Sequence, residues 1–168
     1  MEKQNRKLTR LKSFDYGTVA CYFVTLCTHH RQPLFSMEKS SPGNSPHTIP
    51  NSPANQIIHR WLAESQNKFK NIAIDQYVIM SDHLHLIANI KETRPGCTLA
   101  DAMRFFKTMT TNEYIRGVKQ GVLQPFDEKL WQKSYYDHVI RNQQDFTEIW
   151  EYIENNPVKW MLIHGQLP

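Results

Sequence analysis

Residues 72–90 read IAIDQYVIMSDHLHLIANI and predict two β-strands with a break near Ser81-Asp82. Apolar, β-branched and aromatic residues dominate both halves, and each half has the length of a buried strand. A run of the same character, from Val19 to Thr28, predicts a first central strand. Together the two regions supply three strands of one sheet.

Helical spacing of apolar residues predicts helices between and after these strands. The first helix follows a Pro- and Ser-rich stretch and carries Ile57, Ile58, Trp61, Leu62 and Phe69. The last helix, from Gln143 to Asn155 and closed by Pro157, has a buried stripe of Phe146, Ile149, Trp150 and Ile153. Between them, Thr98 followed by Asp101 is a near capping box that opens a helix reaching Arg116.

A short aromatic strand or turn is predicted within Trp131–Arg141. The order of elements is then strand, helix, strand pair, helix, strand, helix, which is a split βαβ pattern. We therefore expect an α+β fold, a ferredoxin-like sandwich with a central antiparallel sheet.

The chain has 168 residues, 40% of them hydrophobic, which favours one domain with a core of its own. No run approaches the length of a membrane span, and the N-terminus lacks the apolar stretch of a signal peptide, so we expect a soluble, cytoplasmic protein without membrane contact. The three cysteines show no Cys-x-x-Cys spacing, which argues against a disulfide scaffold and a zinc ribbon.

Basic residues are concentrated at the N-terminus. The net charge is +4, and the five basic residues of the first twelve, set against Glu2, account for all of it. We divide the chain into a basic arm, residues 1–17, and a domain, residues 18–168, with a Pro/Ser-rich loop or insert at about 36–56. The arm is equally compatible with an ordinary solvated terminus and with a segment that grips phosphates.

Two histidines form the densest chemical signal. His83 and His85 alternate with Leu84 and Leu86, so in a strand both imidazoles project from one face while the leucines face the core. This spacing allows both to bind one metal ion. A pair of surface or hydrogen-bonded histidines is the alternative interpretation. Asp82 is the adjacent carboxylate, and strand alternation predicts that it points to the opposite face.

Tyr152 and Asn156 lie one turn apart at the edge of the stripe on the last helix. They could bring a phenolic nucleophile and an oxygen ligand together. The alternatives are a packed tyrosine with a solvated hydroxyl and an asparagine at a helix end. Spacing alone does not connect this helix to the histidine strand.

Four segments together resemble the single-tyrosine HUH transposases, and most closely the branch associated with repetitive extragenic palindromes (REP). They are Tyr77-Val-Ile-Met with His83-Leu-His85, Tyr22-Phe-Val-Thr-Leu, Trp131 to Asn142, and Tyr152-Ile-Glu-Asn-Asn-Pro-Val-Lys159. The resemblance runs from about Thr18 to Leu162. It implies the HUH endonuclease fold, and only the Pro/Ser-rich stretch interrupts it.

The resemblance implies a role for individual residues. His83, His85 and Asn156 match the ligands of a divalent metal, Mg²⁺ or Mn²⁺, and Tyr152 matches the nucleophile. Tyr135 and Tyr136 are rival nucleophiles, but neither has an amide one turn later. The expected reaction is cleavage and rejoining of hairpin-containing single-stranded DNA through a 5′-phosphotyrosine intermediate on Tyr152, with the metal polarising the scissile phosphate.

We expect the partner to be single-stranded or hairpin DNA from palindromic repeat elements. Basic side chains would supply phosphate contacts or support the site, and the candidates are Lys3, Arg6, Lys7, Arg10, Arg104, Lys107, His138 and Arg141. The helix that carries Arg104 and Lys107 is equally explained as an amphipathic helix with a solvated basic face. The resemblance favours a monomer, with a dimer as the alternative.

Three other functions compete with this prediction. A replication initiator or relaxase of the HUH type usually has a different motif order. A catalytically silent, domesticated hairpin-DNA-binding protein is disfavoured because both histidines, Tyr152 and Asn156 are present. A metalloprotein unrelated to nucleic acids would need further Asp, Glu or His residues near the strand.

Overall fold

A five-stranded antiparallel sheet, with strand order β2-β3-β4-β1-β5, organises the protein. The computed structural model describes residues 19–39 and 52–163. Its strands are β1 (Ala20–Cys27), β2 (Glu38–Lys39), β3 (Ile72–Ile79), β4 (His83–Ile90) and β5 (Tyr136–Ile140). Its helices are the 3₁₀ turn η1 (His29–Arg31), α1 (Pro53–Lys68), α2 (Leu99–Lys119) and α3 (Gln143–Ile163).

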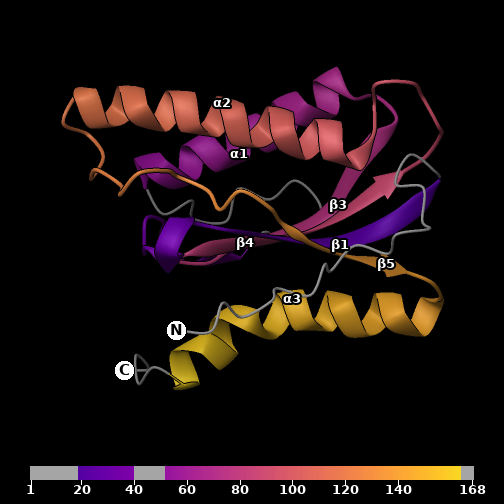
Figure 1. Ribbon diagram of the computed structural model, residues 1–168. Coiled ribbons are helices and arrows are strands. Elements are labelled where there is room, and N and C mark those ends of the chain that lie inside the picture. Colours follow the sequence, from indigo (N-terminus) through magenta and orange to yellow (C-terminus); the bar gives the residue numbers. More distant parts are fainter. Residues whose placement is uncertain (1–18, 40–51, 164–168) are drawn as a thin grey trace, which may run out of the picture.

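The helices lie on both faces of this sheet. Helices α1 and α2 cover one face and α3 covers the other (Figure 1). Along the chain, β1, α1, β3, β4, α2 and β5 follow one another in the β-α-β-β-α-β order of a ferredoxin-like fold. The predicted α+β class and central antiparallel sheet are therefore confirmed.

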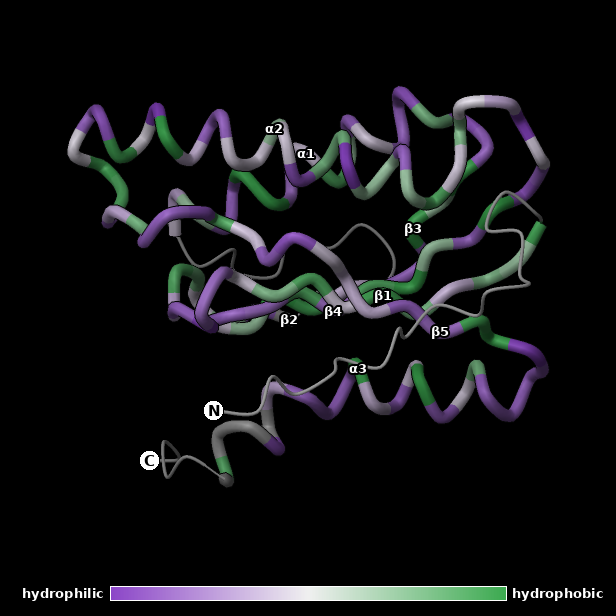
Figure 2. The backbone as a smooth tube through the Cα atoms, viewed as in Figure 1, coloured by the Kyte–Doolittle hydropathy of each residue, from purple (hydrophilic) through white to green (hydrophobic). Residues whose placement is uncertain are grey.

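Two hydrophobic clusters separate these layers. The larger cluster lies between the sheet and the α1/α2 layer and includes Leu84, Leu86 and Ala88 of β4. The smaller one lies beneath α3 and is centred on Val78, Met80, Ile87 and Ile153. Hydrophobic and hydrophilic residues are interleaved along α3, as expected of a helix with one buried face (Figure 2). Strand β4 is consequently buried on both sides.

The predicted start of α2 is confirmed. The Thr98 side chain accepts a hydrogen bond from the Asp101 backbone N–H, and the Asp101 carboxylate accepts one from the Thr98 backbone N–H. This reciprocal pair satisfies two of the N–H groups that a helix leaves unpaired at its first turn.

The stretch predicted as a loop at 36–56 is shorter than expected at both ends. Glu38 and Lys39 pair with Ile79 and Val78 as β2, and α1 begins at Pro53. Proline is tolerated in the first helical turn because its missing N–H has no partner there in any case. Residues 40–51 of this stretch lie outside the described residues, as does the basic arm.

The last helix does not end at Asn155. It continues through Pro157 to Ile163, and its last turns leave the direction of the rest of the helix (Figure 1). Proline removes one backbone hydrogen bond and kinks a helix without always ending it. The prediction of a stop at this proline was wrong.

All three cysteines are free, as predicted. Among the helices in the described ranges, none combines the length and the apolar character needed to cross a membrane.

Candidate functional site

His83 and His85 lie side by side on the face of β4 that α3 covers. Their rings are 4.6 Å apart between centroids, and the two residues are 7% and 5% exposed. The intervening Leu84 belongs to the larger cluster on the opposite face. Strand alternation thus places both imidazoles together, as predicted.

The Asp82 carboxylate orients the His83 ring. Its Oδ1 lies 2.5 Å from His83 Nδ1, and its Oδ2 lies 2.9 Å from Arg31 Nε. Burial raises the pKa of Asp82, but the hydrogen bond and charge of His83, together with the charge of Arg31, hold it below its usual value. An ionised carboxylate accepts the Nδ1 proton of His83, and when the ring is neutral this arrangement leaves its lone pair on Nε2.

The predicted orientation of Asp82 was wrong. Asp82 precedes the first residue of β4, so the alternation of side chains along the strand does not extend to it.

A hydroxyl performs the same task for His85. Thr25, its direct neighbour across the β1–β4 pair, places Oγ1 2.8 Å from His85 Nδ1. Phe23 stacks on the imidazole with ring centroids 5.2 Å apart. Burial, and then the charges of His83 and Arg31, lower the pKa of His85 to about 3. The ring is therefore neutral near pH 7 and has a lone pair for a ligand.

Tyr152 of α3 faces these histidines. Its hydroxyl is 3.5 Å from His85 Nε2, and its ring meets the rings of His85 and Phe23 edge-on. The residue is nevertheless 43% exposed, so it is not enclosed by the packing of α3 on the sheet. Asn156 follows one turn later and is 8% exposed. Tertiary packing supplies the connection between the last helix and the histidine strand that spacing alone could not.

The donors at this site are compatible with a divalent metal. Both histidines have their Nδ1 atoms engaged by neighbouring oxygens, which leaves the Nε2 atoms as ligands. Within the described part of the chain no group of three or more His, Cys, Asp or Glu side chains could hold a metal. The amide oxygen of Asn156, one turn after Tyr152, is the candidate for a third protein ligand. Two imidazoles with oxygen ligands suit Mn²⁺ better than Mg²⁺.

The two rival tyrosines lie on opposite faces of the sheet. Tyr136 pairs with Thr25, so it shares the face of His85, and it is 46% exposed. Tyr135 packs against the larger cluster on the α1/α2 side. Of the two, only Tyr136 remains a competitor of Tyr152 by position.

His138 and Arg141 lie where β5 leads into α3. His138 Nε2 is 2.9 Å from Asp145 Oδ2, which also accepts the Arg141 backbone N–H. Asn142 caps the helix by accepting the Asp145 N–H. These residues therefore anchor the helix that carries Tyr152, and their predicted contact with DNA stays a prediction.

Arg104 and Lys107 lie on α2, in the layer on the other side of the sheet from His83 and His85. Arg104 pairs with Asp101, and the Lys107 ammonium donates to the carbonyls of Gln132 and Lys133. Burial lowers the pKa of Lys107. The predicted role of these two residues in DNA binding remains untested, and that of Lys3, Arg6, Lys7 and Arg10 falls on residues outside the described ranges.

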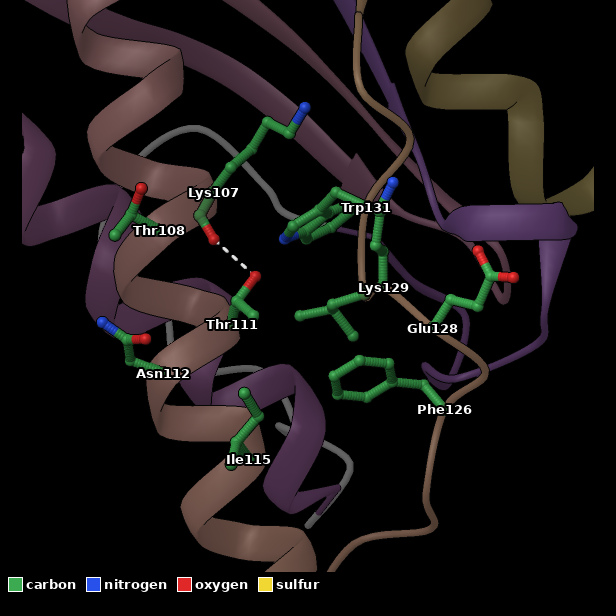
Figure 3. A pocket seen from close by; sticks show the side chains of 10 residues that line it. Lys107, Thr108, Thr111, Asn112, Ile115, Phe126, Glu128, Lys129 and Trp131 are labelled. Carbon is green, nitrogen blue, oxygen red and sulfur yellow. Dashed lines mark hydrogen bonds between the residues drawn. The ribbon is translucent and has the colours of Figure 1, made fainter.

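Lys107 also borders a pocket between α2 and the segment before β5 (Figure 3). Its apolar lining comes from Ile115, Phe126, Leu130 and Trp131. Trp131 connects it to the end of β1 through a bridge to Thr28. The pocket is separate from the histidine and tyrosine site, since none of its lining residues belongs to that site.

A family model described as "Transposase IS200 like" matches residues 21–156. The chain belongs to this family. The expected membership of the single-tyrosine HUH transposases is thereby confirmed, and the matched range includes the two histidines, the tyrosine and the asparagine.

Individual relatives are consistent with this assignment. An uncharacterized protein of Haemophilus influenzae is 30% identical over 176 residues, 93% of this chain and 90% of that protein. A second H. influenzae protein, provisionally assigned as a REP-associated tyrosine transposase, is 30% identical over 94 residues, 54% of this chain and 51% of that protein.

Two solved structures share the fold. A REP-associated tyrosine transposase bound to a REP hairpin has a TM-score of 0.60 at 18% identity, over 94% of this chain and 76% of that one. A Deinococcus radiodurans protein provisionally assigned as a transposase has a TM-score of 0.51 at 15% identity, over 87% and 95%. At these identities the two structures show a shared fold, and the REP-associated relative matches about half of this chain in sequence.

Three residues of the site were not predicted from the sequence. Thr25 and Arg31 gave no signal, because their proximity to the histidines depends on strand register and on the turn after β1. Asp82 did give one, since a carboxylate next to a predicted metal ligand is a common orienting partner.

Proposed function

We propose that the protein is a metal-dependent single-strand DNA transposase, an endonuclease and strand transferase that cleaves and rejoins hairpin-containing DNA through Tyr152. The observation that carries the proposal is the 3.5 Å approach of the Tyr152 hydroxyl to His85 Nε2, beside a second oriented histidine. A half-exposed phenol next to two buried imidazoles is an arrangement suited to attack on a bound phosphate.

In the proposed reaction the Tyr152 oxygen attacks the scissile phosphorus. A tyrosine–phosphate bond forms, the bond from phosphorus to the 3′ oxygen breaks, and the proton lost by the phenol is balanced by the one that the 3′-hydroxyl gains. The products are a 5′-phosphotyrosine and a free 3′-hydroxyl. The 3′-hydroxyl of another strand reverses the step and rejoins DNA, so no high-energy cofactor is required.

His83, His85 and Asn156 are the proposed ligands of Mn²⁺ or Mg²⁺. When bound, the ion would polarise a nonbridging phosphate oxygen and offset the negative charge of the transition state. The protein contributes the orientation of both rings through Asp82 and Thr25. Burial keeps His85 neutral, which preserves its lone pair.

The proposed substrate is single-stranded or hairpin DNA. Membership of a transposase family supports a DNA substrate, and the similar structure with a REP hairpin supports a hairpin. Arg104, Lys107, His138 and Arg141, with the basic arm, are proposed to contact phosphates. The salt dependence of binding would report how many of them do.

A covalent-adduct assay tests the proposal. Purified protein is mixed with a hairpin-bearing single strand labelled at its 3′ end, with Mn²⁺ or Mg²⁺, and resolved on a denaturing gel. We expect a labelled, protein-sized band, because the 5′-phosphotyrosine retains the labelled fragment. Tyr152→Phe should lose this band and keep hairpin binding.

Two further variants identify the nucleophile and the metal ligand. Tyr136→Phe should still form the adduct. If Tyr136→Phe lost the adduct and Tyr152→Phe kept it, Tyr136 would be the nucleophile. His83→Ala should lose the metal-dependent adduct, and an unchanged response to Mn²⁺ would contradict the proposed site. Binding without any adduct across several hairpins would favour the catalytically silent DNA-binding protein.

We also propose that the protein acts as a monomer. Light scattering during gel filtration, with and without hairpin DNA, should give the mass of one chain, and a doubled mass would indicate the dimer.

A further inference from the structure

Arg31 extends the site beyond the residues considered so far. It is the last residue of η1, the turn that follows β1, and its Nε lies 2.9 Å from Asp82 Oδ2. The other oxygen of this carboxylate is the one that orients His83. The Asp82 carboxylate therefore bridges the Arg31 guanidinium and His83, a proposed metal ligand. The positive charge of Arg31 also lowers the pKa of His85.

Contacts with neighbouring residues hold the Arg31 guanidinium in place. Arg31 Nη1 contacts Cys27 Sγ at 2.9 Å, and the Arg31 backbone N–H donates to the Thr28 carbonyl. His30 and Arg31 both have left-handed backbone, with φ of 53° and 57°. Two successive non-glycine residues in this region are uncommon, and such strain is concentrated at functional sites.

Stability alone does not explain this arrangement. The Arg31 side chain is half exposed, and an ion pair in such a position adds little to the stability of a protein. Two strained residues cost more than such a pair contributes. A role in holding the Arg31 guanidinium in position for a ligand would explain the strain in this turn.

The chemistry of Arg31 points to an anionic ligand. The contacts with Asp82 and Cys27 engage Nε and Nη1. A guanidinium has five N–H donors, so the half-exposed side chain has further donors for a ligand. A planar guanidinium fixed by a carboxylate suits phosphate oxygens, which it can bind in a bidentate manner.

We propose that Arg31 is a phosphate-binding residue that grips the DNA backbone beside the scissile phosphate, and that its bond to Asp82 keeps this contact in register with His83. The inference rests on the proposed function, since it assigns part of the substrate grip at the same site. It adds a contact from η1 to those expected from the arm, α2 and β5.

Metal-free DNA binding tests this role. A fluorescein-labelled DNA hairpin with a single-stranded 5′ extension is titrated with the full chain in EDTA at several NaCl concentrations, and binding is followed by anisotropy. Arg31→Gln should weaken binding several-fold. It should also reduce the slope of log K against log salt by about 0.7, the value for one phosphate contact on a single strand.

Arg94→Gln is the matched control. Arg94 is also a half-exposed arginine paired with a carboxylate, that of Glu92, but it follows the far end of β4. Arg94→Gln should bind DNA with the affinity of the wild type and with the same slope of log K against log salt. If Arg31→Gln keeps the wild-type slope, the inference is overturned.

Mn²⁺ titration without DNA distinguishes phosphate binding from a purely positioning role. If Arg31 acted only by holding Asp82 against His83, Arg31→Gln would lose Mn²⁺ affinity and keep the salt slope, which would overturn the inference. If Arg31 binds phosphate, Arg31→Gln should reduce the slope of log K against log salt whether or not its Mn²⁺ affinity changes.

A measurement on the wild-type protein tests the same inference if Arg31→Gln does not fold. Phenylglyoxal modification of arginines, mapped by mass spectrometry, should be slowed by the hairpin at Arg31 and unaffected at Arg94. Equal rates at Arg31 with and without a bound hairpin would contradict the inference alone. Failure of the wild-type chain to bind any hairpin would contradict the proposed function as well.

Discussion

The two histidines of the site differ in the group that holds each ring. His83 Nδ1 faces the ionised Asp82, whereas His85 Nδ1 faces the Thr25 hydroxyl. The first partner carries a charge and the second does not. The two proposed ligands are therefore held by unequal partners.

Thr25→Val is expected to lower Mn²⁺ affinity by about 10- to 100-fold, the usual range for removing the partner of a metal-binding histidine. Valine keeps the branched shape of the strand residue but leaves His85 Nδ1 without its oxygen. Isothermal titration of the DNA-free protein with Mn²⁺ measures the loss. Thr25→Ser retains the hydroxyl and should bind nearly as the wild type does; equal losses in both variants would show that the hydroxyl is not the relevant group.

Among the elements, α2 and α3 begin with different side-chain caps. The start of α2 is closed by the reciprocal pair Thr98 and Asp101. The start of α3 is closed by Asn142, and its Asp145 reaches back to β5 through His138. The first cap stabilises its own helix, whereas the second also fixes the helix that carries Tyr152 to the sheet.

Thr98→Ala should lower the free energy of unfolding by about 1 kcal/mol near neutral pH. Hydrogen bonds from Thr98 are the main cause of the lowered pKa of Asp101. A carboxyl with a lowered folded pKa stabilises the protein above its unfolded pKa, and that contribution is lost as the pH falls through the folded value. Urea unfolding should therefore show a smaller difference between wild type and variant at about pH 3 than at about pH 7. An equal difference at both would contradict this account.

Asp145→Ala should loosen the first turn of α3 and cost about 1 kcal/mol, since His138 and the Arg141 N–H lose their acceptor. Hydrogen exchange in the DNA-free protein should become faster in this turn and stay unchanged in α2. Gln144→Ala, at an exposed neighbouring position, is the control. Unchanged exchange in Asp145→Ala would remove the anchoring role and leave DNA contact as the remaining role for His138.

For the whole molecule, the decisive feature is the unequal burial on the two faces of the sheet. Helices α1 and α2 share a large cluster, whereas α3 rests on a small one. Among the side chains that the structure describes, few buried ones attach the helix that carries Tyr152 and Asn156. Elements with few buried contacts open before the rest of a protein does. The tyrosine depends on this attachment for its approach to His85.

Ile153→Ala should therefore affect α3 more than the α1/α2 layer. Ile153 is 1% exposed at the centre of the smaller cluster, and isoleucine-to-alanine changes in cores cost about 2–5 kcal/mol. Hydrogen exchange should become faster throughout α3, and adduct formation should fall with it. Ile115→Ala makes the same substitution at a partly exposed position on α2 and should cost far less; similar losses in both would contradict the unequal attachment.

Much of the fold was accessible from local pattern. Residue alternation identified the shared face of His83 and His85, apolar periodicity identified the helices, and Thr98 with Asp101 marked a helix start. Two local rules fail in this chain. Pro157 predicts a helix end but only bends α3. The alternation of β4 predicts the wrong orientation for Asp82, because this residue precedes the strand.

Sequence was sufficient wherever a property depends on neighbours along the chain, such as the faces of a strand, the stripe of a helix and the family motif. The meeting of Tyr152 with His85, the Thr25 and Asp82 partners, and the separation of Tyr135 from Tyr136 belong to the tertiary structure. These contacts join residues on different elements, and strand register and helix docking set their distances. Both are products of packing the whole core, which no local pattern specifies.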